Sequence, residues 1–163
     1  MSISIGSKAP DFTLKNSDGK EVTLSSFNGN KNVLVLFFPL AFTGVCTAEL
    51  CSTRDSLADY NSMNAEVLAI SVDSHFTLKQ FKEANNLNFD LLSDFNKKTA
   101  TAYGALYDDF FGMTGVAKRS AFVVDKEGVI QYAEVLEAAK DLPNFSAIQE
   151  VLKGLNWYLF KLD

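Results

Sequence analysis

Hydrophobic residues in this chain gather in short continuous runs that end at turn residues. Val33 to Phe38 is wholly apolar and stops at Pro39, and Val67 to Val72 is a second run, closed by Asp73. Runs of this length without polar alternation are typical of strands buried on both faces, and such strands belong to parallel sheets covered by helices. We therefore expect both runs inside one sheet.

The stretch between these two runs predicts a helix. Thr47 to Asn61 contains helix formers and places Leu50, Leu57 and Tyr60 at roughly helical spacing. A strand, a helix and a strand in this order form a βαβ unit with a right-handed crossover. Further along the chain the same reasoning predicts three more helices, over Phe76 to Ala84, Lys97 to Tyr103 and about Ser146 to Leu152.

Two hairpins complete the predicted elements. Phe12 to Leu14 and Val22 to Leu24 flank a turn with Gly19, and Ala121 to Val124 and Val129 to Val135 flank a turn with Gly128. Helices that alternate with strands indicate the α/β class, with a mixed sheet at the centre. No repeat, low-complexity tract or linker divides residues 1–163, so we expect a single domain.

Composition narrows the choice of partners. The chain has 163 residues and a net charge of −5, from 15 Lys and Arg against 20 Asp and Glu. An acidic chain without a basic run lacks the electrostatic footprint for nucleic acid or an anionic membrane. The longest wholly apolar stretch, Val33 to Phe38, is much too short to span a bilayer.

The cysteine content indicates a reducing compartment. Only two cysteines are present, Cys46 and Cys51, far fewer than in a secreted disulfide scaffold. The N-terminal residues show no basic segment followed by an apolar one, the pattern of a secretory signal. We therefore predict a cytoplasmic protein with both thiols normally reduced.

The loop that leaves the first buried strand is the best candidate for chemistry, because sites in α/β sheets cluster at the carboxyl ends of strands. Cys46 falls at or just inside the start of the next helix, where free amides and the helix dipole favour a thiolate. Thr43 can offer a hydroxyl to the thiolate or to a substrate, and Pro39 stiffens the loop. Arg119 directly precedes the strand that begins at Ala121. If that strand neighbours the first one, its guanidinium faces Cys46 and stabilises the negative charge.

Each of these residues also has a purely structural interpretation. A lone cysteine is usually an inert buried thiol, and Arg119 alone is most often a solvated surface charge. Thr43 alone is typical of a helix cap and Pro39 of a strand stop. It is their combination on one loop after a buried strand that favours a site.

This combination resembles a known family. The segment Pro39-x-x-x-Thr43-x-x-Cys46 resembles the active-site signature of the peroxiredoxins, thioredoxin-fold peroxidases that reduce hydroperoxides at a cysteine. The resemblance covers nearly the whole chain, since four further segments match in the family's order: Gly6 to Leu14, Ser71 to Ser74, Leu91 to Asp94 and Arg119 to Asp125. It implies a thioredoxin-like fold whose mixed sheet is flanked by helices and extended by an N-terminal β-hairpin.

The resemblance also implies roles for the site residues. Cys46 is then the peroxidatic cysteine, Thr43 orients the peroxide, Pro39 shields the sulfur, and Arg119 activates both thiolate and substrate. Glu49 stands where the family often has a polar residue bonded to this network, although an acid in the first turn of a helix is an equally good interpretation. The implied reaction turns the thiolate into a sulfenic acid and needs no metal or organic cofactor.

The resemblance leaves two ways to resolve the sulfenic acid. The Cys-x4-Cys spacing of Cys46 and Cys51 resembles the PrxQ, or bacterioferritin-comigratory-protein, branch, in which the second cysteine resolves the first within one chain. The amino-acid sequence from Phe38 to Cys46 more closely resembles the AhpE-type one-cysteine branch, in which an external thiol resolves the sulfenic acid. We favour Cys51, with thioredoxin or a similar dithiol as the final reductant; as the alternative, Cys51 is a small buried apolar residue.

Other function classes fit less well. A thioredoxin-type oxidoreductase shares the fold but needs Cys-x-x-Cys, and a non-enzymatic redox sensor or chaperone would not turn over peroxide. One His and two Cys give no zinc pattern, and we expect His75 to cap or decorate the helix after Asp73. The loop from Tyr103 to Val116 is expected to contribute to core packing, to line the pocket or to form a dimer surface. By analogy with the family, the resemblance also implies a homodimer.

Overall fold

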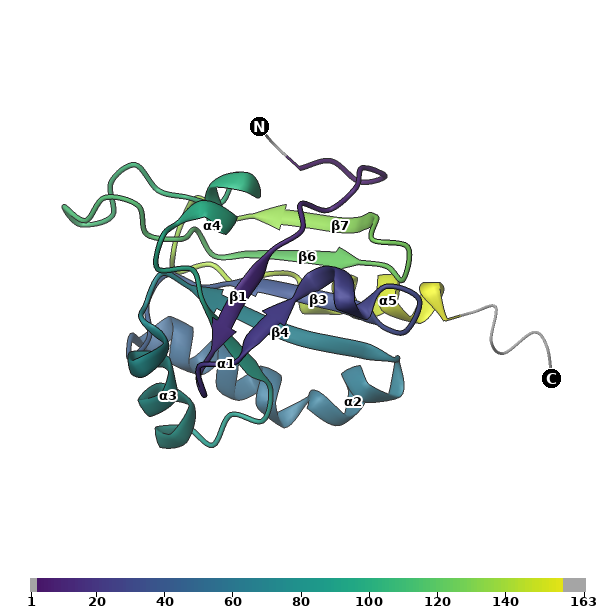
Figure 1. Cartoon of the computed structure of the whole chain (residues 1–163), viewed down its shortest axis with the longest axis horizontal. Helices are drawn as coiled ribbons and strands as arrows, with labels where there is room; N and C mark the ends of the chain where they lie inside the picture. Colours follow the sequence, from purple (N-terminus) through teal and green to yellow (C-terminus); the bar gives the residue numbers. More distant parts are fainter. Residues whose placement is uncertain (1–2, 157–163) are drawn as a thin grey trace.

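The fold is organised by one seven-stranded sheet with the strand order β2-β1-β5-β4-β3-β6-β7. We describe it from a computed structural model for residues 3–156 (Figure 1). The strands are β1 (Thr13–Asn16), β2 (Glu21–Thr23), β3 (Asn32–Phe37), β4 (Ala65–Ser71), β5 (Asp90–Ser93), β6 (Ser120–Val124) and β7 (Ile130–Val135). The helices are η1 (Leu24–Phe27), α1 (Gly44–Asp55), α2 (Leu57–Ser62), α3 (His75–Ala84), α4 (Lys98–Ala102) and α5 (Phe145–Leu155).

Strand β3 lies inside the sheet, as its uninterrupted apolar sequence predicts. All six of its residues are buried. It pairs in parallel with β4 and antiparallel with β6, so the expected mixed sheet is confirmed. Because β6 runs against β3, the end of β3 and the start of β6 meet at the same edge of the sheet.

The side chains of β3 alternate between two hydrophobic layers. Leu34 and Leu36 point into a core that α1, α2, α3 and α5 cover, where they meet Leu50 and Phe81 among others. Val33, Val35 and Phe37 point to the opposite face, which the N-terminal segment, η1 and α4 cover. With apolar partners on both sides, this strand needs no polar face, and helix α1 is held firmly against the sheet.

The predicted hairpins are confirmed. Strands β1 and β2 pair antiparallel around a turn in which Gly19 has a φ of +76°. Strands β6 and β7 pair around Gly128, whose φ is +79°. Both glycines adopt the left-handed backbone region, which residues with a Cβ enter only at an energetic cost.

Four elements differ from the prediction, and one of them is the unpredicted 3-10 helix η1, which includes Leu24, a residue expected at the end of a strand. The helix expected over Thr47 to Asn61 begins earlier, at Gly44, and is broken at Ser56 into α1 and α2. Ser56 leaves the helical region with φ −102° and ψ 7°, in keeping with the weak helix propensity of serine. Strand β5, only four residues long, was not among the predicted strands, because a run this short carries little periodic signal.

The remaining helices match the prediction closely. Helix α3 starts at His75, α4 covers Lys98–Ala102, and α5 extends to Leu155. The aromatic tail with Trp157, Tyr158 and Phe160 lies outside the described residues. No helix between residues 3 and 156 has the length and apolar character needed to cross a membrane.

The two glycines Gly115 and Gly154 should respond in opposite ways to alanine. At Gly115 φ is +79° and an added Cβ would lie 2.6 Å from Lys97 Cδ, so Gly115→Ala should lower the free energy of unfolding by about 1 kcal/mol or more. At Gly154, in helix α5, an added Cβ meets open space, so Gly154→Ala should raise it by about 0.5–1 kcal/mol. Urea unfolding of both variants measures the difference, and equal shifts would contradict the prediction.

Candidate active site

Cys46 lies in the first turn of α1, as the sequence predicts. Thr43 is the N-cap residue of this helix. The first helical hydrogen bond of α1 runs from the Thr47 amide to the Thr43 carbonyl oxygen, over 3.0 Å. The amides of Gly44, Val45 and Cys46 therefore precede the hydrogen-bond ladder and concentrate positive potential near the sulfur. The Cys46 side chain is only 1% exposed, so little water screens this effect.

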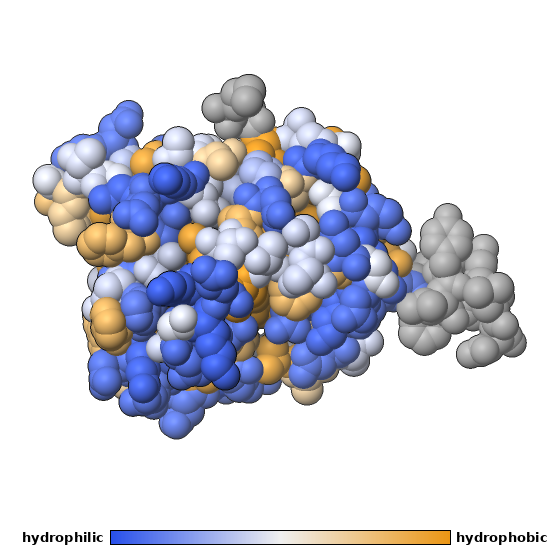
Figure 2. Space-filling model, in the orientation of Figure 1, coloured by the Kyte–Doolittle hydropathy of each residue, from blue (hydrophilic) through white to orange (hydrophobic). Residues whose placement is uncertain are grey.

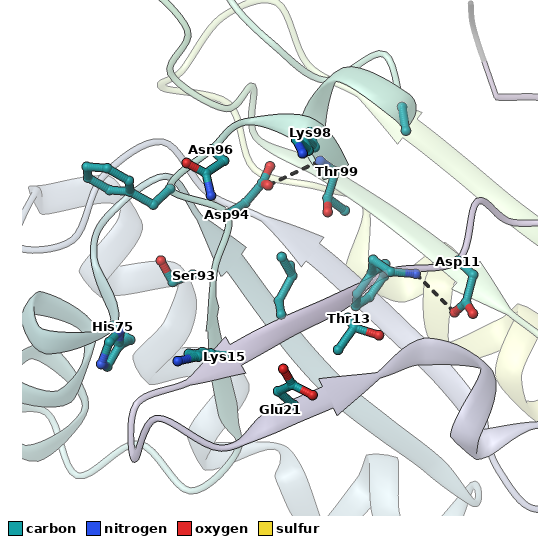
Figure 3. Close-up of a pocket in the computed structure, with 14 residues that line it drawn as sticks. Asp11, Thr13, Lys15, Glu21, His75, Ser93, Asp94, Asn96, Lys98 and Thr99 are labelled. Carbon is teal, nitrogen blue, oxygen red and sulfur yellow. Dashed lines mark hydrogen bonds between the residues drawn. The ribbon is translucent and has the colours of Figure 1, made fainter.

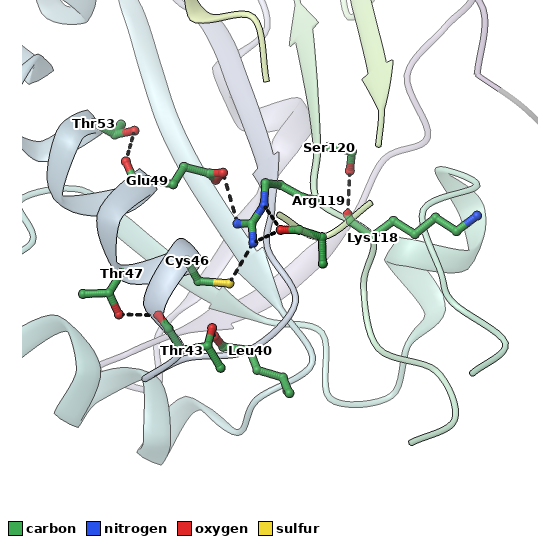
Figure 4. Close-up of polar contacts among 10 residues, drawn as sticks. Leu40, Thr43, Cys46, Thr47, Glu49, Thr53, Lys118, Arg119 and Ser120 are labelled. Atoms are coloured by element: carbon green, nitrogen blue, oxygen red, sulfur yellow. Dashed lines mark hydrogen bonds and ion pairs between the residues drawn. The ribbon is translucent and has the colours of Figure 1, made fainter. Parts of the chain in front are cut away.

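Arg119 reaches Cys46 from the neighbouring strand. Its position follows from the pairing of β3 with β6: Phe37, the last residue of β3, lies opposite Ser120, which directly follows Arg119. The Arg119 Nη2 donates to Cys46 Sγ over 3.4 Å, and both Nε and Nη2 donate to the carbonyl oxygen of Ala139 (Figure 4). The predicted encounter of guanidinium and sulfur is confirmed. A cation at this distance stabilises a thiolate more than a thiol.

Glu49 belongs to the same network. Its Oε2 accepts a hydrogen bond from Arg119 Nη1 at 3.2 Å, and both side chains are almost completely buried. Glu49 lies beyond the first turn of α1, so its interpretation as a first-turn acid is wrong. Burial raises the pKa of Glu49 to about 7, against the opposing effect of Arg119. Its Oε1 has no hydrogen-bond partner among residues 3–156, which adds to the cost of ionisation.

Thr43 uses its hydroxyl within its own loop. Its Oγ1 donates to the carbonyl oxygen of Leu40 over 2.7 Å, and no capping bond from this side chain to α1 is found in the described chain. Thr43 thus occupies the cap position suggested by sequence without a side-chain capping bond, and no bond from its hydroxyl to the Cys46 sulfur is found in residues 3–156. The third suggested use, contact with a substrate, stays a prediction. Because the hydroxyl hydrogen is already donated, the oxygen lone pairs remain to accept a hydrogen bond from a group in the adjacent cavity.

A cavity of about 430 Å³ opens in front of Cys46. Its walls are mostly apolar, and the polar side chains among them are Thr43, Arg119 and Lys140. The complete lining is Pro39, Leu40, Thr43, Gly44, Val45, Cys46, Phe110, Phe111, Met113, Arg119, Ala139 and Lys140. All four residues of the sequence-predicted set, Pro39, Thr43, Cys46 and Arg119, thus border one space. A small molecule in this space faces a sulfur, a cation and a hydroxyl.

Residues 106–117, which we call the arm, form one wall of this cavity. Backbone bridges join Leu106 to Ala117 and Phe110 to Met113, and the arm projects from the molecule at the upper left of Figure 1. Figure 2 shows apolar surface at the same end of the molecule. Phe111 at the tip is 87% exposed and has a φ of +51°, which is unusual for a bulky residue. The base of the arm packs in the core, and only its tip lines the cavity, so two of the three expected uses of this loop occur, while its use as a dimer surface stays a prediction.

Comparison with known proteins decides the family. The model of the AhpC/TSA family matches residues 5–133. The chain belongs to this family. Among its AhpC/TSA relatives, alkyl hydroperoxide reductase E of Mycobacterium tuberculosis (strain ATCC 25618 / H37Rv) is 42% identical over 135 residues, which cover 82% of this chain and 86% of that protein.

Two further relatives represent other branches. Chloroplastic peroxiredoxin Q of Oryza sativa subsp. japonica is 42% identical over 130 residues, or 80% of this chain and 58% of that protein. The crystal structure of the reduced 2-Cys peroxiredoxin of Plasmodium vivax has a TM-score of 0.84 and 30% identity, and covers 94% of this chain and 82% of that one. The chain is therefore a peroxiredoxin, an enzyme of the thiol-peroxidase class, and its thioredoxin-like fold with an N-terminal hairpin is as expected.

The second cysteine of this peroxiredoxin lies apart from the cavity. Cys51 is half-buried on α1, and its thiol points to Asn85 Oδ1 at 3.8 Å. Both cysteines are free thiols. Positions five apart on a wound helix have Cα atoms about 8.6 Å apart and point about 140° away from each other. A disulfide needs about 7 Å or less, so this AhpC/TSA chain can join the two sulfurs only when α1 unwinds.

A second cavity, about 580 Å³, lies elsewhere and shares no lining residue with the Cys46 cavity (Figure 3). It borders the β1–β2 hairpin and α4. Two of its acids are already used in structural bonds: Asp94 accepts the amides of Thr99 and Ala100, and Asp11 accepts that of Ser25.

His75 also borders this second cavity and decorates the start of α3, one of the two uses expected for it, while Ser74 provides the cap. Its ring lies against that of Phe76. In the part of the chain that the structure describes, no three His, Cys, Asp or Glu side chains come together as a metal site.

Sequence reasoning missed two participants of the AhpC/TSA site. The Ala139 carbonyl oxygen accepts two hydrogen bonds from Arg119, yet a main-chain acceptor leaves no mark in the residue types. Asp73 accepts the backbone amide of Ala41 at 2.8 Å. Its segment, Ser71 to Ser74, is part of the family pattern, but only the folded chain reveals which group Asp73 holds.

The raised pKa of Glu49 makes stability depend on pH. The pKa of Glu49 is about 7 in the folded protein and near 4.5 in the unfolded chain, so the native state keeps this proton to a higher pH. The free energy of unfolding therefore falls as pH rises between these two values. Glu49→Gln cannot ionise and lacks this loss. Denaturant unfolding at about pH 5 and about pH 8 should therefore show the variant gaining stability relative to wild type at the higher pH. Parallel pH profiles of the two proteins would refute the assignment.

Proposed function

We propose that this peroxiredoxin reduces hydrogen peroxide and organic hydroperoxides at Cys46. The observation that carries the proposal is the buried Arg119 guanidinium, whose Nη2 lies 3.4 Å from the Cys46 sulfur at the wall of a cavity. Inert structural cysteines are buried in apolar surroundings, whereas reactive ones have a cation or a helix N-terminus beside them. Cys46 has both.

The reaction is a two-electron oxidation of sulfur. The Cys46 thiolate attacks one oxygen of the peroxide, a sulfur–oxygen bond forms, and the oxygen–oxygen bond breaks. The leaving oxygen takes up a proton and departs as water or an alcohol, while the cysteine becomes a sulfenic acid. Sulfur is oxidised and the peroxide is reduced, and the step requires no metal or organic cofactor.

The surrounding residues have separate tasks in this step. Arg119 stabilises the thiolate and the negative charge that develops on the leaving oxygen. The Thr43 oxygen accepts a hydrogen bond from the peroxide O–H and so orients the molecule for attack along the oxygen–oxygen axis. Pro39 shields the sulfur because it offers no amide to solvent, and Glu49 holds the guanidinium from its far side.

The apolar lining supports organic hydroperoxides as substrates beside hydrogen peroxide. A cavity of about 430 Å³ exceeds the need of a two-oxygen molecule, and Phe110, Phe111 and Met113 supply hydrocarbon contacts at its wall. An alkyl or aryl group attached to the peroxide would be buried against the arm. Binding then gains roughly 25 cal/mol for each Å² of apolar surface removed from water.

Removal of the arm's apolar tip should change substrate preference. The double variant Phe111→Ala, Met113→Ala should lower kcat/KM for cumene hydroperoxide by about tenfold and leave that for hydrogen peroxide within about twofold, because only the larger substrate reaches the tip. Phe76→Ala is a matched control, since Phe76 is 73% exposed but does not line this cavity. Steady-state rates with both peroxides test this, and equal losses for the two substrates would contradict the assigned role.

We further propose that Cys51 resolves the sulfenic acid. The Cys51 thiol attacks the Cys46 sulfur, a disulfide forms, and the hydroxyl leaves as water. A dithiol such as thioredoxin then reduces the disulfide and becomes oxidised itself. The half-exposed position of Cys51 and the end of α1 only four residues later, at Asp55, support this route.

The cost of this route is the unwinding of α1. The contacts that would have to break include the Glu49–Arg119 pair and the bond from Arg54 to the Asn85 carbonyl oxygen. Oxidation favours the change, because a neutral sulfenic acid no longer attracts Arg119 as the thiolate does. The alternative is a one-cysteine enzyme in which an external thiol attacks Cys46 while α1 stays wound.

Intact-mass measurement separates the two routes. After one equivalent of hydrogen peroxide, the reduced protein should lose about 2 Da as the Cys46–Cys51 disulfide forms, and Cys51→Ser should instead gain about 16 or 32 Da. A gain of oxygen in the wild type would establish the one-cysteine route. Cys46→Ser should show neither change.

Catalytic turnover distinguishes an enzyme from a redox sensor. With thioredoxin and its reductase as the electron source, each chain should consume many equivalents of peroxide. A single equivalent, however long the incubation, would contradict the proposed catalytic cycle. We propose the cytoplasm as its compartment, since the cycle depends on a pool of reduced thiols.

A further inference from the structure

Asp73 ties the loop before α1 to the rest of the sheet. This loop, residues 39–43, runs from the end of β3 to the N-cap of α1 and carries both Pro39 and Thr43. Asp73 lies in the turn between β4 and α3, and its Oδ2 accepts the amide of Ala41 at 2.8 Å. Apart from the bonds that Thr47 of α1 donates to the Thr43 carbonyl oxygen, this is the one hydrogen bond found within residues 3–156 that joins the loop to another part of the fold.

The Asp73 bond and the Thr43 bond meet in a single peptide unit. The Ala41 amide and the Leu40 carbonyl belong to the same planar group, whose N–H and C=O point in opposite directions. Asp73 accepts the N–H, and the C=O accepts the Thr43 hydroxyl at 2.7 Å. Rotation of this peptide plane would therefore break both bonds together. A negatively charged acceptor on the N–H also polarises the group and strengthens the bond at its carbonyl end.

The Asp73 carboxylate is itself held in place. Ser71 Oγ donates to the same Oδ2 at 2.7 Å, and Ser93 Oγ of β5 donates to the Asp73 carbonyl oxygen at 2.6 Å. Two sheet strands thus fix the residue through its side chain and its backbone. The neighbouring Phe42 has a φ of +63°, an unfavourable backbone for a bulky residue, so the loop does not hold this shape by local preference alone.

We propose that Asp73 is a positioning residue for the peroxidase reaction and acts through the Leu40–Ala41 peptide on the Thr43 hydroxyl. This inference rests on the proposed function of Cys46. By holding the peptide plane, Asp73 keeps the Thr43 hydroxyl hydrogen on Leu40 and the oxygen lone pairs available to the peroxide in the cavity. It touches neither substrate nor sulfur, so its effect on the reaction requires Thr43.

A double-mutant cycle tests this dependence. In a Cys51→Ser background, which removes the resolving step, the rate of Cys46 oxidation by hydrogen peroxide is followed by rapid quench with an alkylating reagent. Asp73→Ala should slow oxidation by about tenfold, and Thr43→Val by about tenfold to a hundredfold. Asp73→Ala added to Thr43→Val should change the rate by less than about twofold, because the group on which it acts is gone.

Two controls distinguish positioning from general damage. Alkylation of Cys46 by iodoacetamide without peroxide should keep its wild-type rate in Asp73→Ala, since Arg119 and the α1 amides are untouched. Asp73→Asn retains an acceptor for Ala41 and should restore most of the oxidation rate. Asp59→Ala, which removes an exposed acid for which no side-chain hydrogen bond is found in the described residues, should leave both rates unchanged. If Asp73→Ala does not fold, Ser71→Ala enters the same cycle.

The outcomes separate this inference from the function on which it rests. Full activity in Asp73→Ala, equal losses in both Thr43 backgrounds, or a parallel loss of alkylation would overturn the positioning role alone. A wild-type Cys46 that peroxide oxidises no faster than a free thiol would overturn the proposed function, and the positioning role with it.

Discussion

The site depends on a single buried cation. The Arg119 side chain is 1% exposed, and a charge taken out of water to this extent is tolerated only when partners surround it. Its partners are the Cys46 sulfur, the Glu49 carboxyl group and the Ala139 carbonyl oxygen. One cation facing two acidic groups balances one negative charge better than two, and burial lets Glu49 keep its proton to a higher pH than a free carboxyl group does. Burial thus both raises the pKa of Glu49 and removes the water that would screen Arg119 from Cys46.

The sheet positions this cation. Arg119 directly precedes β6, and Cys46 lies in the helix that follows β3. The start of β6 and the end of β3 meet at one edge of the sheet because the two strands run antiparallel. Loop contacts refine the arrangement: the arm closes one wall of the cavity, and Asp73 holds the loop that precedes α1. Rigid strands therefore set the position of the charged groups, and adjustable loops shape the space that a substrate enters.

Much of this organisation could be predicted from sequence, for identifiable reasons. The apolar run of β3 and the turn glycines of the hairpins carry strong local signals, and the position of Arg119 follows from strand order. Strand β5 has only four residues and the helix break involves the single residue Ser56, so neither gives a clear pattern in the sequence. Contacts with the rest of the fold determine the conformation at both places. The bond from Thr43 to Leu40 and the bond from Asp73 to Ala41 involve main-chain groups, which look alike in every sequence.

The antiparallel pairing of β3 and β6 also has a consequence for the order of folding. Arg119 lies 73 positions after Cys46, so the cysteine leaves the ribosome long before its cation is synthesised. The pairing that joins them closes a long loop and is an entropically slow step. A nascent or partly folded chain therefore lacks the cation beside Cys46, and the peroxide chemistry proposed for this cysteine becomes available only when β6 joins the sheet.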